Sequence, residues 1–296
     1  ARAARRAARR AAGAAGGRRD DLPADQLMAG AGRERLDQAL VARGLAPTRS
    51  KAQAWILAGL VSIDGEPAKT AGQQVTADHE LTVRDRPRFV SRAGDKLDGM
   101  LEHLEWDVTG ADVLDIGAST GGFTDCLLQR GAARVIAVDV GYGQLDHRLR
   151  EDPRVTVMER TNARTLEAGT LAFAPDLIVA DVSFISLRHV LGPAIASARA
   201  PWRAIVLVKA EFEAQPDDVG KGGVVRDPAV RRQAITSVAR YASDLGAVPL
   251  EARDSGHPGP AGNHEYPLAL VSKDHPLARD ADADPERIAQ QAVDDA

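Results

Sequence analysis

The segment VLDIGASTGGF at residues 113–123 combines an aspartate, three glycines and a serine in a spacing suited to holding a nucleoside. Its apolar start predicts a strand, followed by a tight turn and a helix, and glycine lets the backbone approach a bulky ligand where a side chain would clash. The spacing differs from the G-x-G-x-x-G pattern of dinucleotide sites and from a P-loop. Asp139 ends the next apolar stretch, RVIAV, and its carboxylate can accept hydrogen bonds from both ribose hydroxyls of an adenosine. These features favour S-adenosylmethionine as the ligand and leave NAD open.

Two lysines and two acidic residues stand at the ends of predicted elements in the same part of the sequence. Lys209 follows the apolar stretch AIVLV, and Asp181 follows LIVA. Glu265 begins the last apolar stretch, and Lys96 precedes the first. Strand ends in an open parallel sheet lie along one rim, so these side chains can converge over one ligand. Methyl transfer to a ribose hydroxyl needs that hydroxyl to be oriented and its proton removed, and a lysine can act as the base when a second ammonium lowers its pKa. We therefore expect Lys209 nearest the hydroxyl, with Asp181 and Glu265 holding the lysines in place.

The stretches that position these residues alternate between strand-like and helical patterns from about residue 91 to residue 273. Such alternation predicts an α/β domain with a Rossmann-like parallel sheet and helices on both faces. The predicted strands are 112–116, 134–140, 155–158, 176–182, 203–209 and 265–271, with a further candidate near 247–251.

Residues 33–83 form a smaller block with an α+β pattern. Leu36, Leu40 and Val41 recur at helix spacing and Gly44 ends that helix, while a second helix starts near the sequence PTRS. The sequences VSIDG and LTV follow as short strands, the first closed by an Asp-Gly turn. Basic residues gather around the two helices, where they can neutralise phosphates or simply form a solvated face. They are Arg33, Arg35, Arg43, Arg49 and Lys51.

Composition limits these interpretations. The chain has 296 residues and a formal net charge of −4, so an RNA site must be a local basic patch. The single cysteine, Cys126, excludes an internal disulfide framework and a cysteine-based zinc cluster, and it fits the cytoplasm; we expect no metal site. No apolar run approaches the ~18 residues that span a bilayer. The Ala/Arg-rich residues 1–32 and the acidic residues 274–296 are predicted to be disordered, with a linker at 84–90.

Several motifs, taken in order, are similar to those of one known family. They are VSR at 90–92, KL at 96–97, DIG at 115–117, GGFTD at 121–125, TN at 161–162, DVSFISL at 181–187, KGGVVRD at 221–227 and GNHE at 262–265. Over about residues 33–272 the chain resembles the TlyA-type family, whose members are known both as hemolysins and as ribosomal RNA 2'-O-methyltransferases. The first block resembles the RNA-binding domain of ribosomal protein S4 type, and the second resembles the FtsJ/RrmJ-like methyltransferase fold.

The resemblance implies an S-adenosylmethionine-dependent enzyme that methylates a ribose 2'-hydroxyl of ribosomal RNA, on cytidine, with ribosomal RNA or ribosomal subunits as its partner. It assigns a catalytic set to Lys96, Asp181, Lys209 and Glu265. It implies a cofactor-binding set of Asp115, Gly117, Ser119, Gly121, Gly122, Phe123, Asp139, Val140, Asn162 and Asp181. Arg92, at the end of the basic linker, joins the expected RNA contacts.

The sequence departs from the family pattern at two places. Ala93 stands where a glycine is usual, and Ala210-Glu211 stands where Pro-Gln is expected. The second change places a carboxylate beside a predicted catalytic lysine, where it would repel RNA. Three other functions stay open: a binding module without catalysis, a membrane-active hemolysin and a nicotinamide-dependent enzyme. The sequence offers no spanning segment and no long basic amphipathic helix for a hemolysin.

Overall fold

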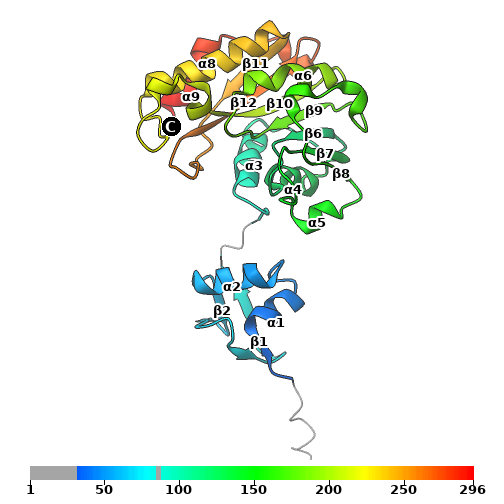
Figure 1. The fold of residues 1–296 in the computed structure, drawn as a ribbon, viewed down its shortest axis with the longest axis vertical. Coiled ribbons are helices and arrows are strands. Elements are labelled where there is room, and N and C mark those ends of the chain that lie inside the picture. Colours follow the sequence, from blue (N-terminus) through cyan, green and yellow to red (C-terminus); the bar gives the residue numbers. More distant parts are fainter. Residues whose placement is uncertain (1–31, 85–87) are drawn as a thin grey trace, which may run out of the picture. The chain divides into compact units, whose positions relative to one another are not determined.

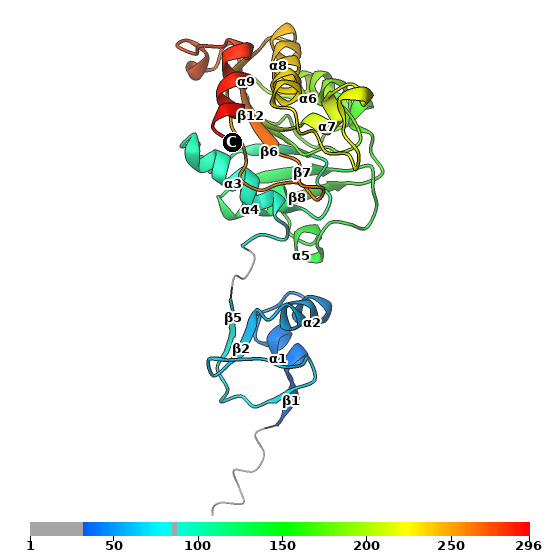
Figure 2. The same cartoon turned by 90° about the vertical axis from the view of Figure 1, so that its left-hand side faces the viewer.

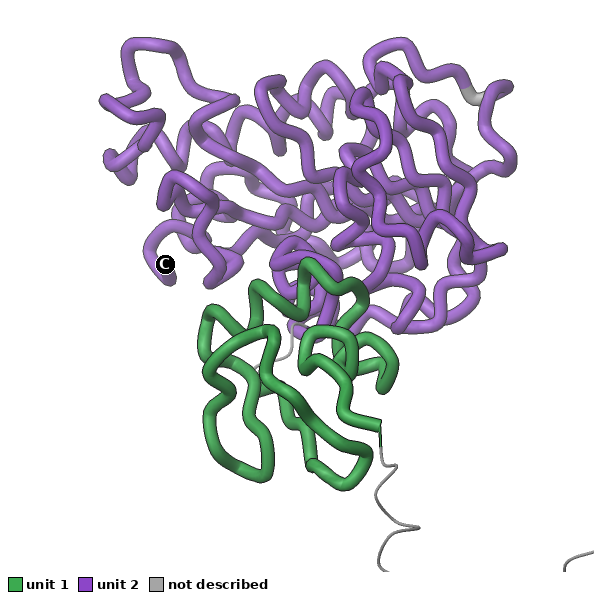
Figure 3. Tube along the Cα trace, turned by 60° about the horizontal axis from the view of Figure 1, so that its bottom comes forward, with its two compact units in different colours: residues 1–86 green, residues 87–296 purple. Residues whose placement is uncertain are grey.

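The computed structural model describes residues 32–84 and 88–296, and the chain divides into two compact units, residues 1–86 and 87–296 (Figure 3). Each unit has a hydrophobic core of its own. The predicted N-terminal tail lies, except for Gly32, outside the described residues.

The first unit is a small α+β domain, as predicted. Gly44, with a φ of +66°, follows the first helix, and Asp64 and Gly65, with φ of +50° and +84°, make the tight turn between two strands. These left-handed conformations explain why the chain turns at these residues. The elements are β1 (Glu34–Arg35), α1 (Leu36–Ala42), α2 (Arg49–Leu57), β2 (Val61–Ile63), β3 (Glu66–Pro67), β4 (Gln74–Val75) and β5 (Leu81–Val83), in sheets ordered β3-β2-β5 and β1-β4.

The second unit is built on a seven-stranded sheet ordered β11-β12-β10-β9-β6-β7-β8, which confirms the predicted α/β class (Figure 1). Its strands are β6 (Asp112–Ile116), β7 (Arg134–Val138), β8 (Val155–Met158), β9 (Leu177–Ala180), β10 (Arg203–Lys209), β11 (Ala247–Ala252) and β12 (Glu265–Ser272). The strand order reverses at β6, and in open α/β sheets ligands bind at such a switch point.

One strand corrects the expectation of a parallel sheet. β12 lies between β10 and β11 and runs antiparallel to both. The first residue of β12, Glu265, is therefore the register partner of Lys209, the last residue of β10. The reversed direction is what brings Glu265 to the rim where the parallel strands end.

Helices cover both faces of the sheet (Figures 1 and 2). One face packs against α3 (Ala93–His103), α4 (Gly122–Gln129) and α5 (His147–Arg150), and the other against α6 (Leu191–Ser197), α8 (Pro228–Asp244) and α9 (Pro285–Asp294). Short α7 (Ala210–Glu213) follows β10. Single 3-10 turns lie at Ala163–Thr165, Ala168–Thr170, Leu187–His189, Pro216–Asp218 and Pro276–Ala278.

Two predicted boundaries differ from the structure. The acidic segment 274–296 contains α9, which packs on α8 and buries Ile288, Ala289, Ala292 and Val293. These residues form one apolar helix face, which a composition average over the segment hides. At the linker, Phe89 is buried against Gly94, where any Cβ would collide with its ring. The last linker residues therefore belong to the second unit.

Candidate active site

A glycine turn after β6 shapes the floor of the site. Gly117 has a φ of +81°, and a Cβ there would collide with the backbone oxygen of Asp181 on the neighbouring strand. Gly121, with a φ of +95°, is the N-cap of α4. Both positions need glycine because other residues rarely adopt this conformation and would also clash. The predicted strand, turn and helix are all present.

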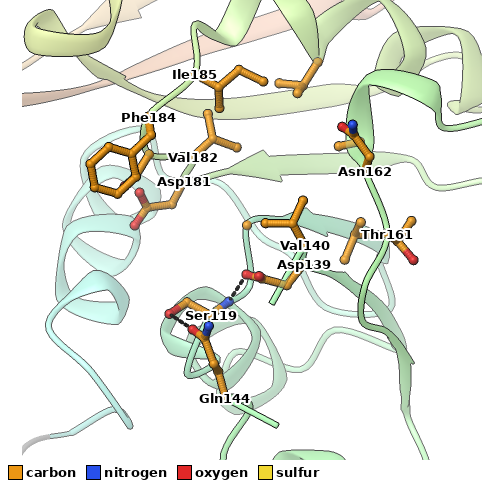
Figure 4. Close-up of a pocket in the computed structure, with 15 residues that line it drawn as sticks. Ser119, Asp139, Val140, Gln144, Thr161, Asn162, Asp181, Val182, Phe184 and Ile185 are labelled. Carbon is orange, nitrogen blue, oxygen red and sulfur yellow. Dashed lines mark hydrogen bonds between the residues drawn. The ribbon is translucent and has the colours of Figure 1, made fainter. Parts of the chain in front are cut away.

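Beside this turn the rim of the sheet opens into a pocket of about 370 Å³ (Figure 4). The Asp139 carboxylate, at the end of β7, lies in its wall and accepts hydrogen bonds from Ser119 N at 2.7 Å and Gly141 N at 2.6 Å. These bonds fix the carboxylate while its remaining lone pairs stay available to a ligand. Six predicted cofactor residues line the pocket: Gly117, Ser119, Asp139, Val140, Asn162 and Asp181.

The other four predicted cofactor residues do not line the pocket. Gly121, Gly122 and Phe123 form the start of α4 and shape the turn. Asp115 is fully buried, and its Oδ2 accepts a hydrogen bond from Thr124 Oγ1 at 2.6 Å. Its Oδ1 has no hydrogen-bond partner among the described residues. Burial raises the pKa of Asp115 to about 7, and the charges of the nearby Asp181 and Asp139 add to this rise.

Sequence reasoning missed several residues of the pocket. Gln144 accepts a hydrogen bond from Ser119 Oγ at 3.3 Å (Figure 4), and no motif singled it out. Ser183, Phe184 and Ile185 also line the pocket, and they belong to the DVSFISL motif. Phe184 has a φ of +62° and is 91% exposed, so the backbone is strained to present an aromatic ring to solvent.

The four predicted catalytic residues form two ion pairs at the same rim. Lys209 Nζ lies 2.5 Å from Asp181 Oδ1 and donates to Ser183 Oγ at 3.2 Å. Lys96 Nζ, from α3, donates to Glu265 Oε2 at 2.6 Å. Since Lys209 and Glu265 are register partners, the two pairs stand side by side on adjacent strands. Asp181 also lines the pocket, so the Lys209 pair is the one beside the pocket.

The departure at Glu211 adds a third carboxyl group to this region. Ala210 is buried at the start of α7. Glu211 is half-buried and its Oε2 has no partner among the described residues. Burial raises the pKa of Glu211, and the charge of Glu265 raises it further.

Comparisons with known proteins agree with this geometry. Residues 89–271 match the FtsJ-like methyltransferase family, and residues 34–81 match the S4 domain. The chain belongs to the FtsJ-like methyltransferase family. It is 49% identical, over 81% of this chain and 90% of the relative, to the 16S/23S rRNA (cytidine-2'-O)-methyltransferase TlyA of Mycobacterium tuberculosis. It is 37% identical, over 78% of this chain and 97% of the relative, to Hemolysin A of Brachyspira hyodysenteriae. A solved hemolysin-named structure from Streptococcus thermophilus has 34% identity and a TM-score of 0.67, covering 90% of this chain and 98% of that one.

The methyl donor of this family, S-adenosylmethionine, fits the pocket, as predicted. The volume lies in the range of about 300–1,000 Å³ typical of small-molecule sites. The carboxylate of Asp139 can accept hydrogen bonds from ribose hydroxyls. The unpartnered Oδ1 of Asp115 can accept one from the ammonium group of the methionine part. Asp115 would then act from below the turn without lining the pocket.

The S4 domain carries five of the six predicted RNA contacts, and the structure distinguishes among them. Arg43 donates at 2.7 Å to the backbone oxygens of His79 and Thr76, so its guanidinium ties the domain together. Arg35 and Arg49 both donate to the fully buried Asp37 and stay about half-exposed. Arg33 and Lys51 are exposed. The sixth, Arg92, is exposed at the N-cap of α3 in the methyltransferase domain.

Among the described residues, no helix is both long and apolar enough to cross a bilayer. Within the same residues no cluster of three or more His, Cys, Asp or Glu is arranged to hold a metal ion.

Proposed function

We propose that this enzyme methylates the 2'-hydroxyl of a cytidine ribose in ribosomal RNA. One observation carries the proposal: the ion pairs Lys209–Asp181 and Lys96–Glu265 stand together at the sheet rim, with Asp181 in the wall of the cofactor pocket. A ribose hydroxyl is a weak acid, so its methylation needs groups that orient it and take its proton. The relatives named as rRNA (cytidine-2'-O)-methyltransferases support the same acceptor.

Lys209 is the residue that acts on the hydroxyl. Asp181 Oδ1 and Ser183 Oγ hold its Nζ at the edge of the pocket. When bound, S-adenosylmethionine supplies an electrophilic methyl group there. The ribose oxygen forms its new bond to the methyl carbon as the carbon–sulfur bond of the donor breaks, so that the donor leaves as a neutral thioether. The ribose oxygen gives up its proton to Nζ of Lys209 in the amine form. Asp181 stabilises the resulting ammonium through their ion pair.

Lys96 and Glu265 act as the second pair of the acceptor site. Both side chains are almost fully buried, and Glu265 is fixed by the register of β12 against β10. Their ion pair places the Lys96 ammonium near Lys209 across the rim. A positive charge there stabilises negative charge that develops on the ribose oxygen.

The exposed ring of Phe184 offers a surface for a base of the RNA. Its centroid lies 5.2 Å from that of Phe212 on α7, the helix that directly follows Lys209. Exposed aromatic rings stack on unpaired bases, and each such stack contributes ~1–3 kcal/mol. The ring therefore supports a single-stranded or extruded nucleotide as the acceptor.

The S4 domain supplies RNA affinity in this proposal. Asp37 accepts from Arg35 Nε at 3.0 Å, Arg49 Nε at 2.9 Å and Gln53 Nε2 at 2.7 Å. These donors, Arg35 first, hold the pKa of Asp37 well below its usual range. The buried carboxylate thus orients two half-exposed guanidiniums, whose remaining N–H groups can bind phosphates.

The test is methylation of ribosomal RNA and isolated subunits with labelled S-adenosylmethionine, followed by nucleoside analysis by mass spectrometry. We expect 2'-O-methylcytidine at a defined site, and we expect the same RNA with a 2'-deoxy residue at that site to be inert. Label on a base, or no transfer to any ribosomal RNA, would refute the proposed acceptor.

A further inference from the structure

A separate, smaller cavity is lined by residues of α3, of β12 and of the segment that follows β11. Its volume is about 170 Å³, and Lys96, Arg253, Asp254 and Ser255 lie in its wall. The cavity is smaller than the ~300–1,000 Å³ of sites for drug-sized ligands. It suits a compact group, and the polar side chains indicate a charged one.

Arg253 is the cation available to such a group. Its side chain is half-buried, yet it has no hydrogen-bond or ion-pair partner within residues 32–84 and 88–296. The neighbouring Asp254 is already occupied: its Oδ1 accepts from Gly256 N at 2.7 Å, and its Oδ2 is hydrogen-bonded to His264 Nδ1 at 2.5 Å. The guanidinium nitrogens of Arg253 are not among the buried atoms that lack a partner, so they reach solvent at the cavity and can bind an anion there.

The register of the strands places this cation on the acceptor rim. Lys209 pairs with Glu265, and Ser255 N donates to Glu265 O at 3.0 Å. Arg253 N donates to Pro267 O, one pair farther along. Side chains alternate between faces along a strand, so Arg253 and Glu265 emerge on the same face, which α3 covers. Along the rim, Asp181 is therefore followed by Lys209, then by the Glu265–Lys96 pair, and then by Arg253. We call this series of charged side chains the row.

From this row we infer that the cavity binds an RNA backbone phosphate that flanks the target ribose, with Arg253 as its principal contact. The inference rests on the proposed function. The 2'-oxygen and the 3'-phosphodiester hang on adjacent ribose carbons, so a ribose held at Lys209 must carry a phosphate close by. The negative charge of that phosphate opposes removal of the hydroxyl proton. A guanidinium offers a fork that matches phosphate geometry and compensates this charge.

The first experiment compares Arg253→Gln with Arg279→Gln, using full-length enzyme and ribosomal RNA. Arg279 is an exposed arginine past the opposite end of β12, and its replacement by glutamine removes the same charge. We expect Arg253→Gln to raise the RNA concentration for half-maximal single-turnover rate about 10-fold and to lower the salt slope of RNA binding by about one. Arg253→Lys should retain part of the affinity. S-adenosylmethionine affinity and melting temperature should match the wild type in every variant.

The second experiment removes the charge from the RNA. Methylphosphonate linkages, which are neutral, replace single phosphates on either side of the mapped methylation site. One flanking linkage should weaken wild-type activity and abolish the difference between wild type and Arg253→Gln. If Arg253→Gln behaves like Arg279→Gln, or if its defect is the same with every neutral linkage, the phosphate site is refuted. Those results require that the wild type methylates the RNA; absence of wild-type methylation would instead refute the proposed function.

Discussion

Replacing Lys209 with methionine tests the central assignment, because catalytic and RNA-binding roles predict opposite kinetic patterns. The lysine side chain is only 10% exposed and its Nζ is held by Asp181 and Ser183, so it offers little to a backbone phosphate. Loss of a group that orients and deprotonates the hydroxyl should lower the single-turnover rate about 10²–10⁴-fold. That range equals about 2.7–5.5 kcal/mol of transition-state stabilisation. The RNA concentration for half-maximal rate should change less than about 3-fold.

The assay is single-turnover methylation at rising concentrations of ribosomal RNA, with enzyme and labelled S-adenosylmethionine in excess. Lys221→Met is the matched control. Lys221 is exposed in the loop after Pro216–Asp218, and its replacement by methionine removes the same charge. It should keep the saturated rate. Methionine at 209 leaves Asp181 buried without its cation, which costs stability. The double variant Lys209→Met/Asp181→Asn removes that cost and should be equally slow. Recovery of the wild-type rate at saturating RNA would leave Lys209 as an RNA-binding residue.

Three further outcomes are expected. Asp139→Ala should weaken S-adenosylmethionine binding, measured by calorimetry, by about 1–3 kcal/mol, because a charged acceptor of ribose hydroxyls is lost; unchanged affinity would remove Asp139 from the site. Asp115→Asn should raise the melting temperature of the ligand-free enzyme above pH 7, because the buried carboxylate of pKa about 7 is ionised there. The same variant should weaken cofactor binding. A change of the melting temperature and the cofactor affinity in the same direction would contradict this role. Deleting residues 1–83 should preserve cofactor binding and greatly reduce methylation of RNA, and full activity of the truncated enzyme would exclude the S4 domain as the recognition module.

The sign of the Asp115 effect follows from linkage. An aspartate has a pKa of about 3.9 in an unfolded chain, and burial raises that of Asp115 to about 7. Its contribution to stability is therefore most favourable below pH ~4 and is lost as the pH rises through 7. Asparagine cannot ionise, so it escapes this loss. A bound ammonium group would reverse the order by stabilising the ionised aspartate.

Local patterns were enough to predict most elements of the fold. Apolar stretches bounded by glycine or charge located all seven strands of the large sheet, because a strand buried on both faces must be apolar throughout. The direction of β12 was not predictable in this way. It depends on pairing with β10 and β11, which are distant in sequence, and no local signal distinguishes the two directions. α9 was missed because its four buried residues lie in a segment whose average composition is acidic, and only their helical spacing marks them.

The candidate site shows the same division. Strand-end positions and family motifs identified Lys96, Asp181, Lys209 and Glu265, and the structure brings them together in two pairs. Neither motif nor periodicity could indicate Arg253, whose meaning comes from the absence of a partner within the described residues. The role of Asp37 could not be predicted either, because it also depends on contacts that only the fold creates. The sequence presents Arg35 and Arg49 as exposed cations, and only the fold reveals that one buried carboxylate holds both.

The two buried ion pairs are themselves an argument for catalysis over a binding role alone. Taking charged groups out of water costs several kcal/mol per ion, and apolar residues of similar size often stabilise a fold as well or better. Lys209–Asp181 and Lys96–Glu265 nevertheless stand together at one rim, although apolar cores lie on both faces of the same sheet. Of these four residues, only Asp181 lines the pocket for the methyl donor, so binding the donor alone requires neither lysine. The two lysines are needed only when an acceptor hydroxyl is bound, because its proton must then be removed close to a phosphate. Fixed charges then stabilise the transition state without having to reorganise, which is the gain that offsets their burial.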